Sequence, residues 1–167
     1  RCIPAARALL KDAKTVHLGC IVLGRLPFKE AKAALIEELA GARGIARVQI
    51  VNTLAGARNP GLITTLTQWI GSADDPALAE AALAALGKAG TPPAAQALAD
   101  ARLASGTLAK ARDEALIVAA DRLAAEGKCA EARAIFERLF SARPSPIIAV
   151  AALRGLVETD KGGALAR

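Results

Sequence analysis

Apolar and polar residues alternate along the chain in amphipathic segments, and five of these segments end in leucine. The closing leucines are Leu23, Leu54, Leu86, Leu123 and Leu156, and the steps between them are 31, 32, 37 and 33 residues. A spacing of this size is the length of one helical hairpin, and recurrence at such a period is the sequence signature of a repeat architecture. The pattern therefore predicts a stack of helical hairpins.

A second apolar set follows each of the first four leucines at a fixed distance. Twelve residues later stand Leu35, Leu66, Leu98 and Ile135, and sixteen residues later stand Leu39, Ile70, Arg102 and Leu139. Arg102 alone breaks this pattern. Because the same offset recurs in four units, we interpret each unit as a first helix followed by a second one.

Turn residues lie where this register requires them. Between the two helices of a unit stand Leu26-Pro27, Arg58-Asn59-Pro60-Gly61, Gly90-Thr91-Pro92-Pro93 and Glu126-Gly127-Lys128. Asp75-Pro76 and Ser145-Pro146 predict helix starts, because Asp and Ser accept hydrogen bonds from exposed amides and Pro is tolerated at the first helical position. Extra residues around Ser105-Gly106-Thr107 account for the long step, and we expect them in the link between units.

These signals predict an all-α fold in a single domain over residues 1–167. We expect a partial helix at 4–12, and paired helices at 14–26 and 28–40, 44–56 and 60–71, 76–88 and 92–104, and 109–126 and 129–142. A further helix at 146–159 is left unpaired, and residues 160–167 are interpreted as the start of a truncated partner helix. The chain does not begin with Met and opens in a helix-like pattern, so we expect it to be a fragment of a longer protein.

Composition agrees with a helical core of small side chains. Hydrophobic residues make up 53% of the chain and aromatic residues only 2%, with no Tyr and no Met. The alternation of β-branched and aromatic residues that is typical of strands is missing. Three widely spaced cysteines indicate no disulfide framework, and no segment has the pattern of a signal peptide or a membrane span.

Residues 78–90 and 16–26 resemble the first helix of HEAT repeats, of the short kind found in phycobilisome-lyase-like proteins, which commonly ends in Leu-Gly. The resemblance covers nearly the whole chain. It implies a right-handed α-α superhelix, here of about four to five hairpins, whose second helices line a concave face that usually binds proteins. The family's Asp before the first helix is matched by Asp74 and Asp75, and its Arg within that helix by Arg47. Residues 122–142 are instead similar to a tetratricopeptide hairpin.

Five residues are candidates for partner contact. Trp69 occupies a register position that is otherwise polar or marginal, so we expect it either to anchor a partner or to fold over the neighbouring turn and cover the core. The second helices also carry the basic residues Lys32, Arg102, Arg133 and Arg138. Acidic residues share these helices, and mixed charge favours a protein partner over nucleic acid. Phe136 and Phe140 are predicted to pack inside.

Candidate catalytic chemistry is weak. His17 and Cys20 lie three residues apart on one predicted helix, an arrangement that could serve a metal or an activated thiolate. Cys20, however, shares its register position with Val51, Leu83 and Ala120, which predicts a buried, inert thiol. With one histidine in the chain, a zinc site lacks ligands at suitable spacing. We predict no catalytic residue, no cofactor and no metal site.

Charge leaves a second function open. The net charge is +6, and residues 1–60 hold ten Lys or Arg against four Asp or Glu. Our leading hypothesis is a noncatalytic protein-interaction scaffold with a protein partner. The alternatives are nucleic-acid binding through a basic face, and a lyase acting on a bilin or a glycosylase. The enzymatic alternative depends on the family resemblance alone.

Overall fold

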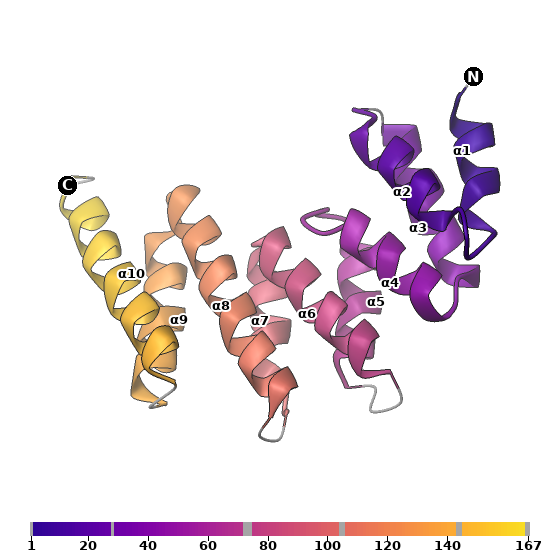
Figure 1. The fold of residues 1–167 in the computed structure, drawn as a ribbon. Coiled ribbons are helices and arrows are strands. Elements are labelled where there is room, and N and C mark those ends of the chain that lie inside the picture. Colours follow the sequence, from indigo (N-terminus) through magenta and orange to yellow (C-terminus); the bar gives the residue numbers. More distant parts are fainter. Residues whose placement is uncertain (1, 28, 72–74, 104–105, 143–144, 166–167) are drawn as a thin grey trace.

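The computed structural model describes residues 2–27, 29–71, 75–103, 106–142 and 145–165, with side chains to residue 160. In this part of the chain it contains ten α-helices and no strand (Figure 1). The helices are α1 (Cys2–Leu10), α2 (Val16–Arg25), α3 (Lys29–Gly41), α4 (Gly44–Thr53), α5 (Pro60–Ile70), α6 (Pro76–Ala89), α7 (Pro92–Asp100), α8 (Thr107–Ala125), α9 (Cys129–Ser141) and α10 (Pro146–Leu165).

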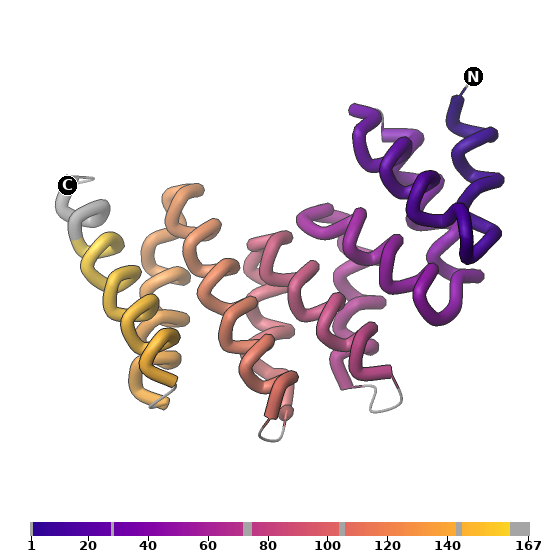
Figure 2. Tube along the Cα trace, viewed as in Figure 1, coloured from indigo at the N-terminus to yellow at the C-terminus, as the bar shows by residue number. Residues whose placement is uncertain are grey.

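The helices form two layers in one row. The first helices of the repeats, α2, α4, α6, α8 and α10, pack each against the next, and the second helices α3, α5, α7 and α9 lie behind them (Figure 1). Figure 2 shows the chain passing along this row from α1 to α10. The predicted all-α solenoid of stacked hairpins is therefore confirmed.

The observed helix boundaries differ from the predicted ones at two instructive places. α7 ends at Asp100 and not at residue 104, so Arg102 lies beyond the helix. This explains why Arg102 breaks the apolar register.

The second difference concerns residues 160–165, which continue α10 and do not begin a new helix. Gly162 and Gly163 weaken a helix by about 1 kcal/mol each relative to Ala, but they do not forbid it as Pro would. Residues 166–167 lie outside the described part.

Side-chain caps begin three helices where the sequence places Pro at the first helical position. The Oδ1 atom of Asp75 accepts a hydrogen bond from the amide of Leu78 at 3.0 Å, as the predicted cap requires. Asn59 caps α5 and Thr91 caps α7 in the same way. α10 begins at Pro146 as expected. Asp74 and Ser105 lie outside the described residues.

The core follows the repeat register and consists mainly of leucine and alanine. Leu23, Leu54, Leu86 and Leu123 are all buried, and so are Leu35, Leu66 and Leu98. Eight alanines are fully buried: Ala31, Ala79, Ala82, Ala94, Ala119, Ala120, Ala132 and Ala152. Because alanine is small, the helices that carry it approach one another closely.

Phe136 is only 1% exposed, as predicted, but the prediction that Phe140 packs inside is wrong, because this ring is 46% exposed. The buried face of α9 is centred on Ala132, Phe136 and Leu139. Phe140 lies at the edge of that face, in the last turn of the helix.

The glycines that follow two closing leucines lie where neighbouring first helices meet. A Cβ atom on Gly87 would stand 2.7 Å from the carbonyl oxygen of Ala115 in α8, and one on Gly24 would stand 2.8 Å from Cγ2 of Thr53 in α4. Both distances are shorter than a Cβ contact allows. The Leu-Gly ending thus has a packing cause, since the next repeat approaches at that position.

α10 presents an apolar stripe to solvent. Ile147, Val150, Leu153 and Val157 are 81%, 68%, 50% and 47% exposed. In the repeat register Val150 and Leu153 correspond to Ile117 and Ala120 of α8, which the following helices bury. At the same register position as Val150, however, α6 carries the exposed Glu80, so the stripe combines a position that α8 buries with one that is exposed elsewhere in the stack. No helix in the described part combines the length and the apolarity that a bilayer crossing requires.

Candidate partner-binding groove

A groove lies between the second helices of two consecutive repeats, α7 and α9. α5 lies close to α7, whereas the backbones of α7 and α9, like those of α3 and α5, run further apart. The space between them has a volume of about 290 Å³. Its lining residues are Pro92, Ala95, Gln96 and Ala99 of α7, Leu116 and Leu123 of α8, and Glu131, Ala134, Ile135, Arg138 and Leu139 of α9. The groove is thus mainly apolar, and α8 forms its floor.

Local features of the sequence account for the separation of α7 and α9. α7 has only 9 residues, whereas α9 has 13. Ala95 and Ala99 offer small side chains on the face that looks toward Ile135. The longest repeat step also falls here, because it contains the link between α7 and α8. A short helix and small side chains on its groove face thus leave room between α7 and α9.

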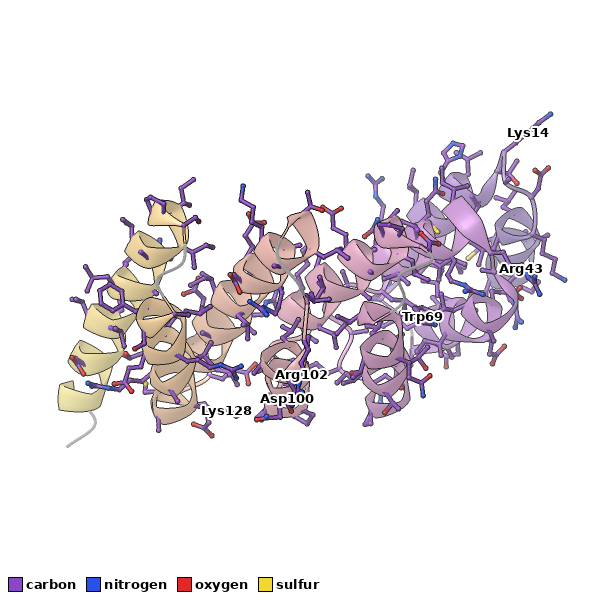
Figure 3. The ribbon with its side chains drawn as sticks, turned by 90° about the horizontal axis from the view of Figure 1, so that it is seen from below. Lys14, Arg43, Trp69, Asp100, Arg102 and Lys128 are labelled. Carbon is purple, nitrogen blue, oxygen red and sulfur yellow. The ribbon has the colours of Figure 1, made fainter. Side chains whose placement is uncertain are left out.

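Three arginines gather at the end of this groove, and we refer to Arg102, Arg112 and Arg138 as the arginine cluster. With Ala99, Asp100 and Ala101 they line a recess of about 440 Å³ at the C-terminal end of α7. Figure 3 shows Asp100 and Arg102 at this end of the helix. Arg138 lines both the groove and the recess, so the two are continuous.

Two members of the cluster bind backbone carbonyls at the end of α7. Arg138 donates to the carbonyl oxygen of Ala99, and Arg112 donates through Nη1 to that of Ala101 at 3.3 Å. Carbonyls at a helix C-terminus lack partners within the helix and carry partial negative charge, which attracts cations. Arg112 also pairs with Asp113 at 2.7 Å. These contacts fix Arg112 and Arg138 in place.

Arg102 differs from the other two members. Its side chain is exposed, and it makes no hydrogen bond or ion pair with the residues that the structure describes. The neighbouring Asp100 accepts two hydrogen bonds from Nε2 of Gln96, both at 2.9 Å. Among the described residues, the donors of Arg102 are therefore without a partner.

The structure brings two of the predicted basic residues together and separates the others. Arg102 and Arg138 meet in the arginine cluster. Arg133 turns toward α10, where it pairs with Asp160, and it also pairs with Glu137 at 2.8 Å. Lys32 lines a different recess, of about 220 Å³, beside Gly24 and residues 53–57. The candidate basic residues thus lie in three places along the row.

Trp69 lies on α5 and is only partly exposed (Figure 3). Its indole packs against the core, and the guanidinium carbon of Arg47 stands 5.2 Å from the ring centroid. A cation over an indole face at this distance is attracted to the ring. Nε of Arg47 also donates to the carbonyl oxygen of Ala42 at 2.7 Å. The tryptophan therefore helps to join α4 and α5, and its contact with a partner stays a prediction.

Sequence reasoning missed Arg112 and the groove itself. Arg112 has no counterpart in the leucine register, because it belongs to the first turns of the long helix α8. Two signals nevertheless pointed to this junction. One was the 37-residue step, and the other was the break of the apolar register at Arg102.

His17 and Cys20 do not form a reactive pair. Cys20 is 6% exposed, and burial raises the pKa of its thiol, which disfavours the thiolate. His17 is exposed on the same helix. In the described part of the chain, no group of three or more His, Cys, Asp or Glu residues is arranged to hold a metal ion.

Five of the described basic side chains outside the cluster are paired with acids. Examples are Arg7 with Glu37 and Glu38, Arg58 with Glu126, and Arg154 with Asp121. Hydrogen bonds from Arg58 and Lys128 lower the pKa of Glu126. Burial raises the pKa of Asp121, and the charge of Arg154 partly opposes this effect. These ion pairs neutralise part of the positive charge of the described residues.

Comparison with known proteins supports the repeat assignment. A family model of HEAT repeats matches residues 32–120, which run from α3 into α8 and include Arg102 and Arg112. A search of curated proteins found no match. The matched range covers more than half of the chain and lies within the stacked hairpins of the structure. The chain therefore belongs to the HEAT-repeat family.

Proposed function

We propose that this protein is a noncatalytic interaction scaffold that binds a segment of a partner protein in the groove between α7 and α9. The observation that carries the proposal is the separation of these helices above an apolar floor, with an arginine cluster at one end. HEAT solenoids commonly use their stacked units to present extended binding surfaces.

The lining supports a protein partner. Protein interfaces combine an apolar centre with a polar rim, and their binding energy is concentrated in side chains that enter well-packed pockets. Here Ala95, Ala134 and Ile135 form part of an apolar centre, while Gln96 and Glu131 lie at the rim. The volume of about 290 Å³ suits a few aliphatic side chains of a partner.

Nucleic-acid binding is the second candidate, because the chain is basic overall. The groove lining contains no aromatic side chain for base stacking. The lack of stacking side chains in the groove favours a protein partner. The lyase and glycosylase alternatives depend on the family resemblance, and the groove adds no observation in their support.

The test is to fill the groove without disturbing the core. Ala134 is exposed on α9 and lines the groove, so Ala134→Trp blocks it, and Ala33→Trp on the exposed face of α3 is the matched control. Peptides selected from a random display library for binding to the wild-type chain are then titrated against both variants. We expect Ala134→Trp to abolish binding and Ala33→Trp to leave it unchanged.

Two results would contradict the proposal. In one, the selected peptides bind the Ala134→Trp variant as well as they bind the wild type. In the other, the display selection yields no binder, and the chain instead retains single-stranded or duplex DNA with an affinity that falls steeply as salt is added. Circular dichroism of each variant shows whether the helices are intact.

A further inference from the structure

We infer that the segment bound in this groove is an amphipathic helix that places a carboxylate side chain against Arg102. This inference rests on the proposed function, because it names the chemistry of the partner that the groove receives. Three observations support it: the length of the groove, the difference in charge between its ends, and the free hydrogen-bond donors of Arg102.

The length of the groove matches two turns of a helix. Its walls run from Pro92 to Ala99 on α7 and from Glu131 to Arg138 on α9, which is seven residues along each helix. At a rise of 1.5 Å per residue this is about 10 Å. A helix bound in a groove presents anchors at positions i, i+3 or i+4, and i+7, which span the same length. The apolar side chains on one face of the partner helix enter the groove, while the backbone of that helix stays outside.

The two ends of the groove carry opposite charge. Glu131 stands at one end, and the arginine cluster lies at the other. Glu131 is exposed and forms no ion pair with the described residues. A carboxylate on the partner is therefore repelled at the Glu131 end and attracted at the arginine end. Such complementarity determines the direction and the specificity of an interface.

Arg102 is the member of the cluster that is free to bind this carboxylate. Arg112 is held by Asp113 and by the carbonyl of Ala101, and Arg138 is held by the carbonyl of Ala99. An arginine fork with free donors binds a carboxylate through two parallel hydrogen bonds. Arg102 also lies just past the last turn of α7, so the bound carboxylate extends the line of the apolar anchors.

The experiment uses two synthetic helical peptides that are rich in Ala and Gln. Both carry leucines at positions i, i+3 and i+7, and they differ only at position i+10, which is Glu in one peptide and Gln in the other. Fluorescence anisotropy measures the binding of each peptide to the wild-type chain and to Arg102→Gln, Arg102→Lys and Glu131→Gln. Arg102 and Glu131 are exposed and make no hydrogen bond or ion pair with the described residues, so these variants are expected to fold.

We expect the Glu peptide to bind the wild type at least fivefold more tightly than the Gln peptide. This preference disappears in Arg102→Gln, is partly retained in Arg102→Lys, and persists in Glu131→Gln. It also falls at high ionic strength, because the pair is exposed to solvent.

The outcomes separate this inference from the proposed function. If both peptides bind equally and Ala134→Trp abolishes both, the groove binds helices but Arg102 does not select a carboxylate. If the preference survives in Arg102→Gln, the inference is also overturned. If neither peptide binds although display-selected peptides depend on the groove, the helical partner is wrong and the proposed function stands. Binding that Ala134→Trp leaves unchanged contradicts the proposed function itself.

Discussion

The guanidinium of Arg58 donates a hydrogen bond to the carboxylate of Glu126, although 68 residues separate them in the sequence. Arg58 lies in the turn that follows α4, and Glu126 directly follows α8. Nε of Arg58 also donates to the carbonyl oxygen of Ala89 at 3.1 Å, at the end of α6. One side chain thus connects three consecutive repeats, whereas most contacts in a solenoid join immediate neighbours.

Replacing Arg58 should make stability less dependent on pH in the acid range. The hydrogen bond from Arg58 lowers the pKa of Glu126 in the folded state. A carboxylate with a lowered pKa stabilises the fold above the ordinary pKa of glutamate, and this contribution is lost as the pH falls through the lowered value. We therefore expect Arg58→Gln to unfold at lower urea concentration than the wild type at neutral pH, with a smaller difference in acid.

Urea titrations at neutral pH and at several acidic pH values would measure this effect. Arg25→Gln is the control, because Arg25 is exposed on α2 and makes no described ion pair. A difference between Arg58→Gln and the wild type that stays constant across the pH series would show that Glu126 does not contribute. In that case Arg58 would stabilise the fold only through its hydrogen bond to the carbonyl oxygen of Ala89.

Adding one methyl group at Gly87 should destabilise the stack. The Cβ atom of alanine would lie 2.7 Å from the carbonyl oxygen and 2.9 Å from the Cα atom of Ala115. Because these are backbone atoms, α6 and α8 must move apart, and we expect Gly87→Ala to cost about 1–3 kcal/mol of unfolding free energy.

Gly41→Ala is the matched control. Gly41 is the last residue of α3, and a Cβ atom there meets nothing within 4 Å. Alanine favours the helix by up to about 1 kcal/mol relative to glycine, so this change should be neutral or slightly stabilising. Thermal unfolding followed by circular dichroism compares the two variants. Equal midpoints for both would mean that the contact between α6 and α8 tolerates the added methyl group.

Truncation of two phenylalanines one turn apart on α9 should give very different results. Phe136 is fully buried, and its ring lies against Gly155 of α10, where a Cβ atom would overlap it. We expect Phe136→Ala to lose about 3–5 kcal/mol, because it leaves a cavity in the contact between α9 and α10. Phe140→Ala removes a half-exposed ring and should cost about 1 kcal/mol or less. Unfolding in urea measures both, and similar losses would contradict the assigned core.

The helices and their starts were predictable because the signals are local. Asp75 and Pro76 stand next to each other in the sequence, and the cap that they form involves an amide three residues away. The leucine register was equally readable, since each repeat must bury the same face against the next. Features that depend on one residue and its near neighbours were therefore predicted to within a few positions.

Features that depend on the separation of helices were not predictable in this way. The groove exists because α7 and α9 stand apart, and α7 has only 9 residues. Phe140 is exposed because no helix of the described residues covers the edge of α9 on which it lies. The partners of Arg58 and the carbonyl of Ala101 that binds Arg112 lie outside the helix or turn that carries each arginine, and the register alone could not identify them.

The core of fully buried alanines has a consequence for how this chain tolerates mutation over evolutionary time. Alanine gives up no side-chain rotamer freedom when it is buried, so these positions contribute packing at the cost of backbone order alone. Truncation to glycine costs about 1 kcal/mol of helix stability, whereas enlargement also forces two closely packed backbones apart. At these positions selection therefore acts chiefly against substitutions that increase side-chain volume. Sequences that diverge from this one should keep its small buried residues longer than its large ones.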